Sequence, residues 1–107
     1  MAIDLDRDNY ENEVLKSALP VMVDFWGPQC RPCLALTPTV EKLEKEYEGK
    51  LKVGKVSAPT NRMLCAKLRV MGLPAFLFYK NGIEVKRVVG EATIEKDLLQ
   101  VIKEIVN

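Results

Sequence analysis

The chain has 107 residues, 48% of them hydrophobic, and its 16 basic and 15 acidic residues leave a net charge of +1. This length and apolar content predict one domain, residues 1–107, around a single core. With charges of both signs interspersed and apolar stretches too short to span a bilayer, the composition predicts no nucleic-acid partner and no membrane partner.

The N-terminal residues predict a short strand followed by a helix. Apolar and acidic residues alternate around Ile3, which is typical of an edge strand. Asp8 or Asn9 is expected to cap a helix over Tyr10–Ala18. Pro20 is expected to end that helix.

The next stretch combines a buried strand with two cysteines. Val21–Trp26 is a run of large side chains interrupted only by Asp24, which predicts a central strand buried on both faces. Pro32 is tolerated in the first turn of a helix. Cys30 is therefore expected at the start of a helix, with Cys33 one turn later on the same face.

An amphipathic helix is predicted to continue as far as Gly49. Leu36, Val40 and Leu43 recur at helical spacing among charged residues. Pro38 lies inside this helix and removes one of its hydrogen bonds, so a kink is expected there.

The second half of the chain alternates strands and helices. We expect strands over residues 51–56, 75–79 and 83–89, and helices over residues 61–68 and 94–105. Asn81-Gly82 is typical of a two-residue hairpin, which makes the last two strands antiparallel. Thr93 is expected to cap the last helix. This order of elements predicts an α/β fold with a mixed sheet and helices on both faces.

Cys30 and Cys33 have the spacing of a redox-active dithiol at a strand-to-helix junction. The free N–H groups at the helix start favour a thiolate, and the charge of Arg31 should lower the pKa of Cys30 further. A stabilised thiolate stabilises the reduced form. Arg31 is therefore expected to make the couple more oxidising than a Cys-Gly-Pro-Cys site.

Two structural roles for this cysteine pair are less favoured. A disulfide that closes only two residues would stabilise the fold little. A zinc site needs four ligands, and the chain has no histidine and one further cysteine, Cys65. Cys65 lies among leucines and is expected to pack as a small hydrophobic residue, with a regulatory thiol or an intermolecular bridge as the alternative.

The compartment is expected to be the cytoplasm. The acidic N-terminus lacks the layout of a signal peptide. Three cysteines are also an odd number for an exported protein whose cysteines pair.

Several motifs are spread over nearly the full chain: VDFWGPQCRPC at residues 23–33, Pro38, Lys55, GLPAF at 72–76, KNG at 80–82 and VVG at 88–90. In these motifs the chain resembles the thioredoxin family. The resemblance implies a thioredoxin fold, in which a central mixed five-stranded sheet carries helices on both faces.

The resemblance also implies roles for single residues in disulfide exchange. Cys30 would be the attacking thiolate, and Cys33 the buried thiol that closes the intramolecular disulfide. Asp24 would accept the proton of the resolving thiol. Burial should raise the pKa of Asp24, and the neighbouring Lys55 should lower it again. The alternative for Asp24 is a buried polar group that is satisfied structurally.

A substrate-docking groove is implied around Pro74, which resembles the family's cis-proline facing the dithiol. In the family this residue also excludes metal, and it would leave the backbone of Leu73 free to pair with an extended substrate. Trp26, Gly72 and Gly90 would frame the groove. Core packing is an equal alternative for Trp26.

The resemblance implies a monomeric thiol–disulfide oxidoreductase that reduces disulfides of protein substrates. A separate reductase, linked to pyridine nucleotides or to ferredoxin, would recharge it. The chain has no dinucleotide-binding fingerprint, so no cofactor is expected.

Gln29 and Arg31 depart from the family pattern, in which tryptophan and glycine are common at these positions. One alternative is therefore a more oxidising disulfide oxidase or isomerase tuned by Arg31. The other is a dimeric metal or iron–sulfur module in which two chains each supply Cys30 and Cys33.

Overall fold

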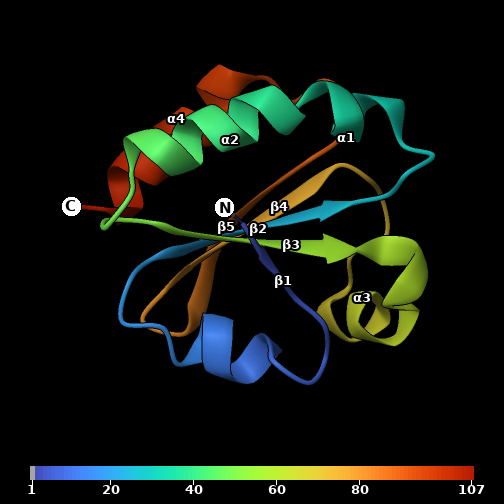
Figure 1. The fold of residues 1–107 in the computed structure, drawn as a ribbon, viewed down its shortest axis with the longest axis horizontal. Helices are drawn as coiled ribbons and strands as arrows, with labels where there is room; N and C mark the ends of the chain where they lie inside the picture. The colour runs from blue at the N-terminus through green and yellow to red at the C-terminus, as the bar shows by residue number, and fades with distance from the viewer. Residues whose placement is uncertain (1) are drawn as a thin grey trace.

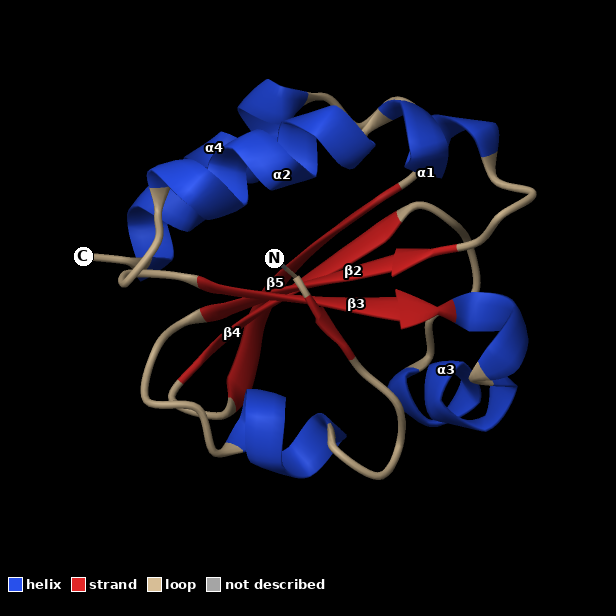
Figure 2. Cartoon of the chain, viewed as in Figure 1, coloured by secondary structure: helices blue, strands red, loops and turns tan. Residues whose placement is uncertain are grey.

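A five-stranded mixed sheet organises the chain, which a computed structural model describes over residues 2–107 (Figure 2). The strands are β1 (Ile3–Asp4), β2 (Val21–Trp26), β3 (Lys52–Ser57), β4 (Ala75–Lys80) and β5 (Ile83–Val89). The helices are η1 (Glu11–Leu15), α1 (Arg31–Ala35), α2 (Thr37–Glu46), η2 (Ala58–Thr60), α3 (Arg62–Leu68) and α4 (Glu95–Ile105). The strand order is β1-β3-β2-β4-β5, with β1, β3 and β2 parallel and with β4 and β5 each antiparallel to its preceding neighbour. The predicted α/β order and mixed sheet are confirmed.

Helices cover both faces of the sheet, as predicted (Figure 1). Helices α2 and α4 lie over one face, where Met22 and Phe76 are buried. Helices η1 and α3 lie over the other face, where Phe25 and Leu77 are buried. Alternate residues of β2 and β4 therefore enter two separate cores, which explains why both central strands are apolar along almost their whole length.

The hairpin between β4 and β5 has the turn that its sequence predicts. Asn81 and Gly82 both have positive φ angles, 55° and 79°, as a two-residue turn between twisted strands requires. A β-carbon on Gly82 would lie 2.5 Å from the carbonyl oxygen of Leu15. Glycine is therefore needed at this position for space as well as for its backbone angle.

In place of one kinked helix, the structure has two helices, α1 and α2, with Leu36 between them. The break comes two residues before Pro38, which is the second residue of α2. Proline has no N–H to donate to the carbonyl four residues earlier, and its ring crowds that carbonyl. The predicted disturbance at Pro38 is confirmed, whereas the expectation of a continuous helix is wrong.

The first helix is shorter than predicted and begins from a different cap. The side chain of Asp6 accepts a hydrogen bond from the amide of Asn9 (3.1 Å), and the side chain of Asn9 accepts one from the amide of Asp6 (2.9 Å). This reciprocal pair, and not Asp8, satisfies the free amides ahead of η1. Lys16 closes η1 by donating its amide to the carbonyl of Glu11 (2.9 Å), a wide π-type turn.

The last helix also starts later than predicted. Ile94, rather than Thr93, is the N-cap of α4, and the amide of Ile94 donates to the side chain of Asp97 (2.9 Å). The hydroxyl of Thr93 instead donates to the carbonyl of Gly90 (2.7 Å). Thr93 therefore connects α4 to the end of β5. No helix among residues 2–107 is long and apolar enough to cross a bilayer.

Candidate active site

The two cysteines of the motif lie where β2 gives way to α1, as predicted. Cys30 is the N-cap of α1 and is joined to Cys33 by a disulfide with a Cα–Cα distance of 5.2 Å. Cys30 is partly exposed, whereas Cys33 is 4% exposed. The pair therefore has an outer sulfur that a partner can reach and an inner sulfur that is shielded.

The backbone around Cys30 favours a negative charge on its sulfur. The amide of Cys33 donates a hydrogen bond to the Cys30 Sγ (3.2 Å). Amides at the start of a helix stabilise a thiolate over a thiol, and this effect acts within the first turn. Helix α1 has only five residues, but these include the first turn, so its amides still stabilise a Cys30 thiolate. Pro32 follows in the first turn of α1, where its missing N–H costs no hydrogen bond.

Arg31 lies beside Cys30 but is exposed to solvent. Its positive charge still favours the thiolate, although water and salt screen an exposed charge. The contribution of Arg31 is thus smaller than that of a buried cation would be.

Asp24 is a buried carboxyl group in the central strand. It is 6% exposed and is paired in register with Lys55 of β3. Burial raises the pKa of Asp24 from its ordinary value of 3.8 to about 7, and the charge of Lys55 acts in the opposite direction. Both directions agree with the expectation from the sequence. Asp24 can therefore gain and lose a proton near neutral pH.

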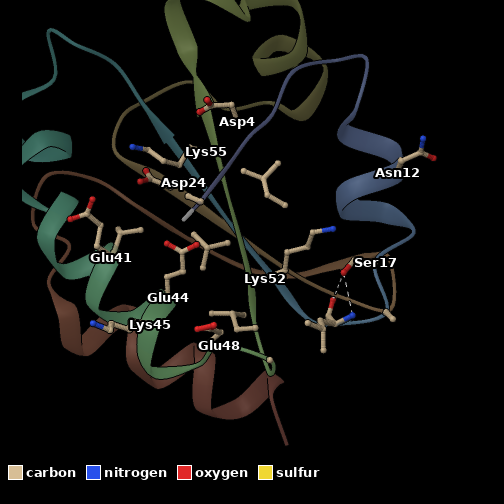
Figure 3. A pocket seen from close by; sticks show the side chains of 18 of the residues that line it. Asp4, Asn12, Ser17, Asp24, Glu41, Glu44, Lys45, Glu48, Lys52 and Lys55 are labelled. Atoms are coloured by element: carbon tan, nitrogen blue, oxygen red, sulfur yellow. Dashed lines mark hydrogen bonds between the residues drawn. The ribbon is translucent and has the colours of Figure 1, made fainter.

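An open cavity of about 930 Å³ connects Asp24 with solvent. Asp24 and Lys55 lie together at one end of it, and Glu41 and Glu44 of α2 line the same space (Figure 3). The carboxyl group is thus buried among side chains but retains a route along which water can carry a proton.

Lys55 also contacts Trp26. Its Nζ atom lies 4.9 Å from the centre of the indole ring, within range of a cation–π interaction. Trp26 is partly exposed and belongs to neither buried core. Core packing therefore does not account for Trp26, and its docking role stays a prediction.

A cis peptide bond joins Leu73 to Pro74, as expected from the sequence. The amide of Gly90 donates to the carbonyl of Pro74 (2.9 Å), and Gly90 has a φ of 116°, a backbone angle suited to glycine. Gly72 is exposed, and no residue among 2–107 hydrogen-bonds to the amide or carbonyl of Leu73. The backbone of Leu73 is thus free for a partner strand.

The loop that carries the dithiol lies against the loop that carries the cis-proline. A β-carbon placed on Gly27 would lie 3.5 Å from Leu73 and 3.5 Å from Pro59. The carbonyl of Gly27 in turn accepts a hydrogen bond from the amide of Cys30 (3.0 Å). The structure therefore brings the two groups of predicted site residues together.

The sequence analysis does not identify Arg87, which binds the end of α3 ahead of the loop to Pro74. Its guanidinium donates to the carbonyls of Leu68 and Arg69 at the end of α3 (3.1 Å each) and forms an ion pair with Glu84 (2.5 Å). An irregularity in the β4–β5 register puts Glu84 and Arg87 on one face, although residues three apart on a regular strand point to opposite faces. No local pattern in the sequence predicts that irregularity.

Cys65 is the free cysteine of the described residues; it belongs to α3, faces the core and is 8% exposed. Burial raises the pKa of its thiol. This placement agrees with packing as a small hydrophobic residue. Among residues 2–107, no group of three or more histidine, cysteine, aspartate or glutamate side chains is arranged to hold a metal ion.

Comparison with known proteins finds similarity to thioredoxins, in agreement with the resemblance noted in the sequence. The family model for thioredoxin matches residues 1–104. The chain is 36% identical to "Thioredoxin 1" of Nostoc sp., with 91% of this chain and 97% of that protein covered. It is 40% identical to "Thioredoxin" of Rickettsia bellii over 84% of this chain and 86% of that protein. It is also 38% identical to "Thioredoxin C-2" of Corynebacterium nephridii, with 83% and 82% covered.

Proposed function

The chain belongs to the thioredoxin family and is a thiol–disulfide oxidoreductase by its redox-active cysteine pair, and from this premise we propose that it reduces disulfide bonds in other proteins. The observation that carries the proposal is the asymmetry of the pair. The reachable sulfur of Cys30 accepts an amide hydrogen bond, while that of Cys33 is buried one turn away.

The reaction begins with Cys30 as a thiolate. It attacks one sulfur of the substrate disulfide, forming a mixed disulfide and releasing the other substrate sulfur as a thiolate that takes a proton from water. Cys33 then loses its proton and attacks the Cys30 Sγ, and the second substrate thiolate leaves. Two electrons pass to the substrate, and the Cys30–Cys33 disulfide is the product.

Asp24 takes the proton that Cys33 loses in the second step. A carboxyl group with a pKa near the working pH suits this role. Lys55 keeps that pKa from rising further, and the open cavity lets the proton pass on to solvent. Asp24 would act through water, since its side chain is aimed at the cavity that it shares with Lys55 (Figure 3).

An extended segment of the substrate docks beside the dithiol. The unpaired backbone of Leu73 can form strand-like hydrogen bonds with it. Trp26, Gly72 and Gly90 frame this docking place, and Pro74 keeps Leu73 in position.

The oxidised protein is recharged by a separate reductase, linked either to pyridine nucleotides or to ferredoxin, and it acts as a monomeric electron carrier in the cytoplasm. A buried, unpaired Cys65 suits a reducing compartment. Turnover of the oxidised protein by purified reductases of each type, together with the mass of the protein in solution, tests these statements.

The direct test of the function is the reduction of insulin disulfides with dithiothreitol as the electron source. We expect turnover with the wild type and its loss in Cys30→Ser, because the nucleophile is removed. Cys65→Ala is the matched control, since it removes a cysteine outside the pair, and it should retain turnover. Retained turnover in Cys30→Ser would contradict the assignment of the nucleophile.

A further inference from the structure

The near-neutral net charge hides a strongly basic segment. From Gly49 to Ile83 the chain has seven lysines and arginines and no aspartate or glutamate. This segment includes η2, α3 and the loop to Pro74. Helix α3 and the dithiol helix α1 both lie at the end of the sheet where β2 and β3 end (Figure 1). The part of the basic segment that forms η2, α3 and the loop to Pro74 is therefore next to the candidate active site.

A groove of about 700 Å³ lies on this segment, between η2, α3 and the loop before Pro74. It is lined by Pro59, Arg62, Cys65, Arg69, Met71 and Leu73, together with smaller residues, and no carboxylate lines it. Met71 is 95% exposed at its edge, and Met63 of α3 is 74% exposed. We call this surface the basic groove: it is apolar inside and carries two guanidinium groups.

The basic groove is continuous with the dithiol loop. Pro59 and Leu73, which line it, are the two residues that lie against Gly27. Gly27 accepts the amide hydrogen bond of Cys30. A peptide whose disulfide meets Cys30 and whose backbone pairs with Leu73 can therefore extend directly into the groove.

The two arginines have no evident structural purpose. Among the residues that the structure describes, neither guanidinium forms an ion pair or a hydrogen bond. Arg62 is in the first turn of α3, where the helix dipole disfavours a positive charge. Because no carboxylate lines the apolar groove on which these arginines lie, they indicate a ligand that is both apolar and negatively charged.

We propose that the basic groove extends the docking place beyond Leu73 and selects disulfide-bearing protein segments in which an apolar side chain is flanked by aspartate or glutamate. The apolar side chain enters the groove beside Met71, and the flanking carboxylates face Arg62 and Arg69. This inference rests on the proposed function, because the segment is part of the disulfide substrate. The apolar interior favours a protein segment over a nucleic acid, whose outer surface is phosphate.

Two peptides, each cyclised by one disulfide, test the proposal. They are identical except that one carries Asp-Leu-Asp beside a cysteine and the other carries Asn-Leu-Asn. Pre-reduced protein is mixed with each peptide, the reaction is stopped with acid, and the second-order rate of reduction is measured by chromatography. We expect the wild type to reduce the acidic peptide about fivefold faster at low salt, and the preference to fall toward one at about 0.5 M salt.

The variant Arg62→Gln/Arg69→Gln should lose this preference. The matched control is Lys96→Gln/Lys103→Gln, which removes two exposed cations of α4, on the other face of the sheet, and should keep the preference. Ala66 is exposed and lines the groove. Ala66→Glu places a negative charge there, so it should make the Asn-Leu-Asn peptide the faster substrate. This variant tests the proposal if the double arginine variant does not fold.

The outcomes separate the two proposals. If the wild type reduces neither peptide, the proposed function fails and the docking site fails with it. If it reduces both at the same rate, or if the arginine variant keeps the preference, only the docking site is overturned. Tight binding of a labelled single-stranded oligonucleotide at about 0.15 M salt, lost in the arginine variant, would also overturn it by assigning the groove to nucleic acid.

Discussion

Asp24 is the residue whose chemistry depends most on burial. Its side chain is placed in the central strand of the sheet, where water is scarce, and Lys55 offsets only part of the resulting rise in its pKa. Buried charge of this kind lowers stability. A buried carboxyl group of this kind fits the proton-accepting role that we propose for Asp24.

The pH dependence of stability tests this description of Asp24. The folded protein holds the Asp24 proton up to a pKa of about 7, whereas the unfolded chain releases it near 3.8. The folded state therefore binds the proton more strongly, and stability falls as the pH rises from about 4 to about 7. We expect oxidised Asp24→Asn to exceed the wild type in free energy of unfolding by up to about 4 kcal/mol at pH 8 and to match it near pH 4.

Denaturant unfolding at several pH values measures this difference. Asp8→Asn is the control, because Asp8 is exposed, and it should follow the wild type at every pH. A constant offset between Asp24→Asn and the wild type from pH 4 to pH 8 would mean that Asp24 does not titrate in this range.

Arg31 is predicted to tune the potential of the dithiol. Its charge stabilises the Cys30 thiolate and so the reduced form, but its exposure limits the effect. We expect Arg31→Gly to lower the reduction potential by roughly 10–30 mV, measured by equilibration with glutathione. Arg31→Lys, which keeps the charge, should stay close to the wild type. An unchanged or raised potential in Arg31→Gly would rule out the tuning role.

At the scale of elements, the hydrophobic pattern predicted most of the fold. Strand β2, strand β5 and the turn at Asn81-Gly82 lie where the sequence indicates, because an apolar run and a two-residue turn are set by local chemistry. The helix starts were less predictable. The side chains of Asp6 and Asp97 accept the amide hydrogen bonds at the starts of η1 and α4, and other acidic residues, such as Asp8 and Glu95, lie close to them in the sequence.

The site was predictable to the extent that its residues lie in local motifs. The Cys30–Cys33 disulfide, the cis bond at Pro74 and the direction of the Asp24 pKa shift all agree with what the sequence predicts. Arg87 was not predicted, because its partners lie 18 and 19 residues away, at the end of α3. Only the fold brings them together.

Arg87 joins β5 to the end of α3 and so supports the loop that leads to Pro74. We expect Arg87→Gln to lower the free energy of unfolding by about 1–2 kcal/mol, since it leaves the Leu68 and Arg69 carbonyls without their donor. Hydrogen exchange of the amides from Cys65 to Val70 should quicken.

Lys86→Gln is the control for Arg87, because Lys86 is the exposed neighbour on the same strand. It should change neither measurement. Equal exchange rates in Arg87→Gln and the wild type would mean that the guanidinium does not hold the end of α3.

At the scale of the whole molecule, the two faces of the sheet serve different purposes. The face beneath α2 carries Asp24 and its cavity. The face beneath η1 holds a buried pair of tyrosines: the hydroxyls of Tyr10 and Tyr79 lie 2.8 Å apart, and burial raises the pKa of both. This pair connects η1 to β4 near the start of β2, whereas the dithiol follows the end of β2.

The tyrosine pair is predicted to act as a unit in stability. Tyr10→Phe and Tyr79→Phe should each cost about 1–2 kcal/mol, because each leaves a buried hydroxyl without a partner. The double variant should cost less than the sum of the two, by about 1 kcal/mol. Chemical denaturation of the four proteins gives this double-mutant cycle, and strict additivity would contradict the coupling.

The distribution of charge is also a property of the whole molecule. In the sequence, 16 basic and 15 acidic residues are interspersed and leave a net charge of +1. In the fold, the segment without acidic residues contributes α3 and the loop beside the dithiol, so a protein of nearly neutral net charge carries the basic groove beside its candidate active site.

The central claim is that Cys30 attacks the substrate and that Cys33 releases it. The most direct measurement is the mass of a trapped intermediate: Cys33→Ser is mixed with a disulfide-cyclised peptide, and the attachment site is located by mass spectrometry after digestion. The account predicts a stable mixed disulfide on Cys30 and none with Cys30→Ser. A peptide attached to Cys65, or no attached peptide in Cys33→Ser, would contradict it.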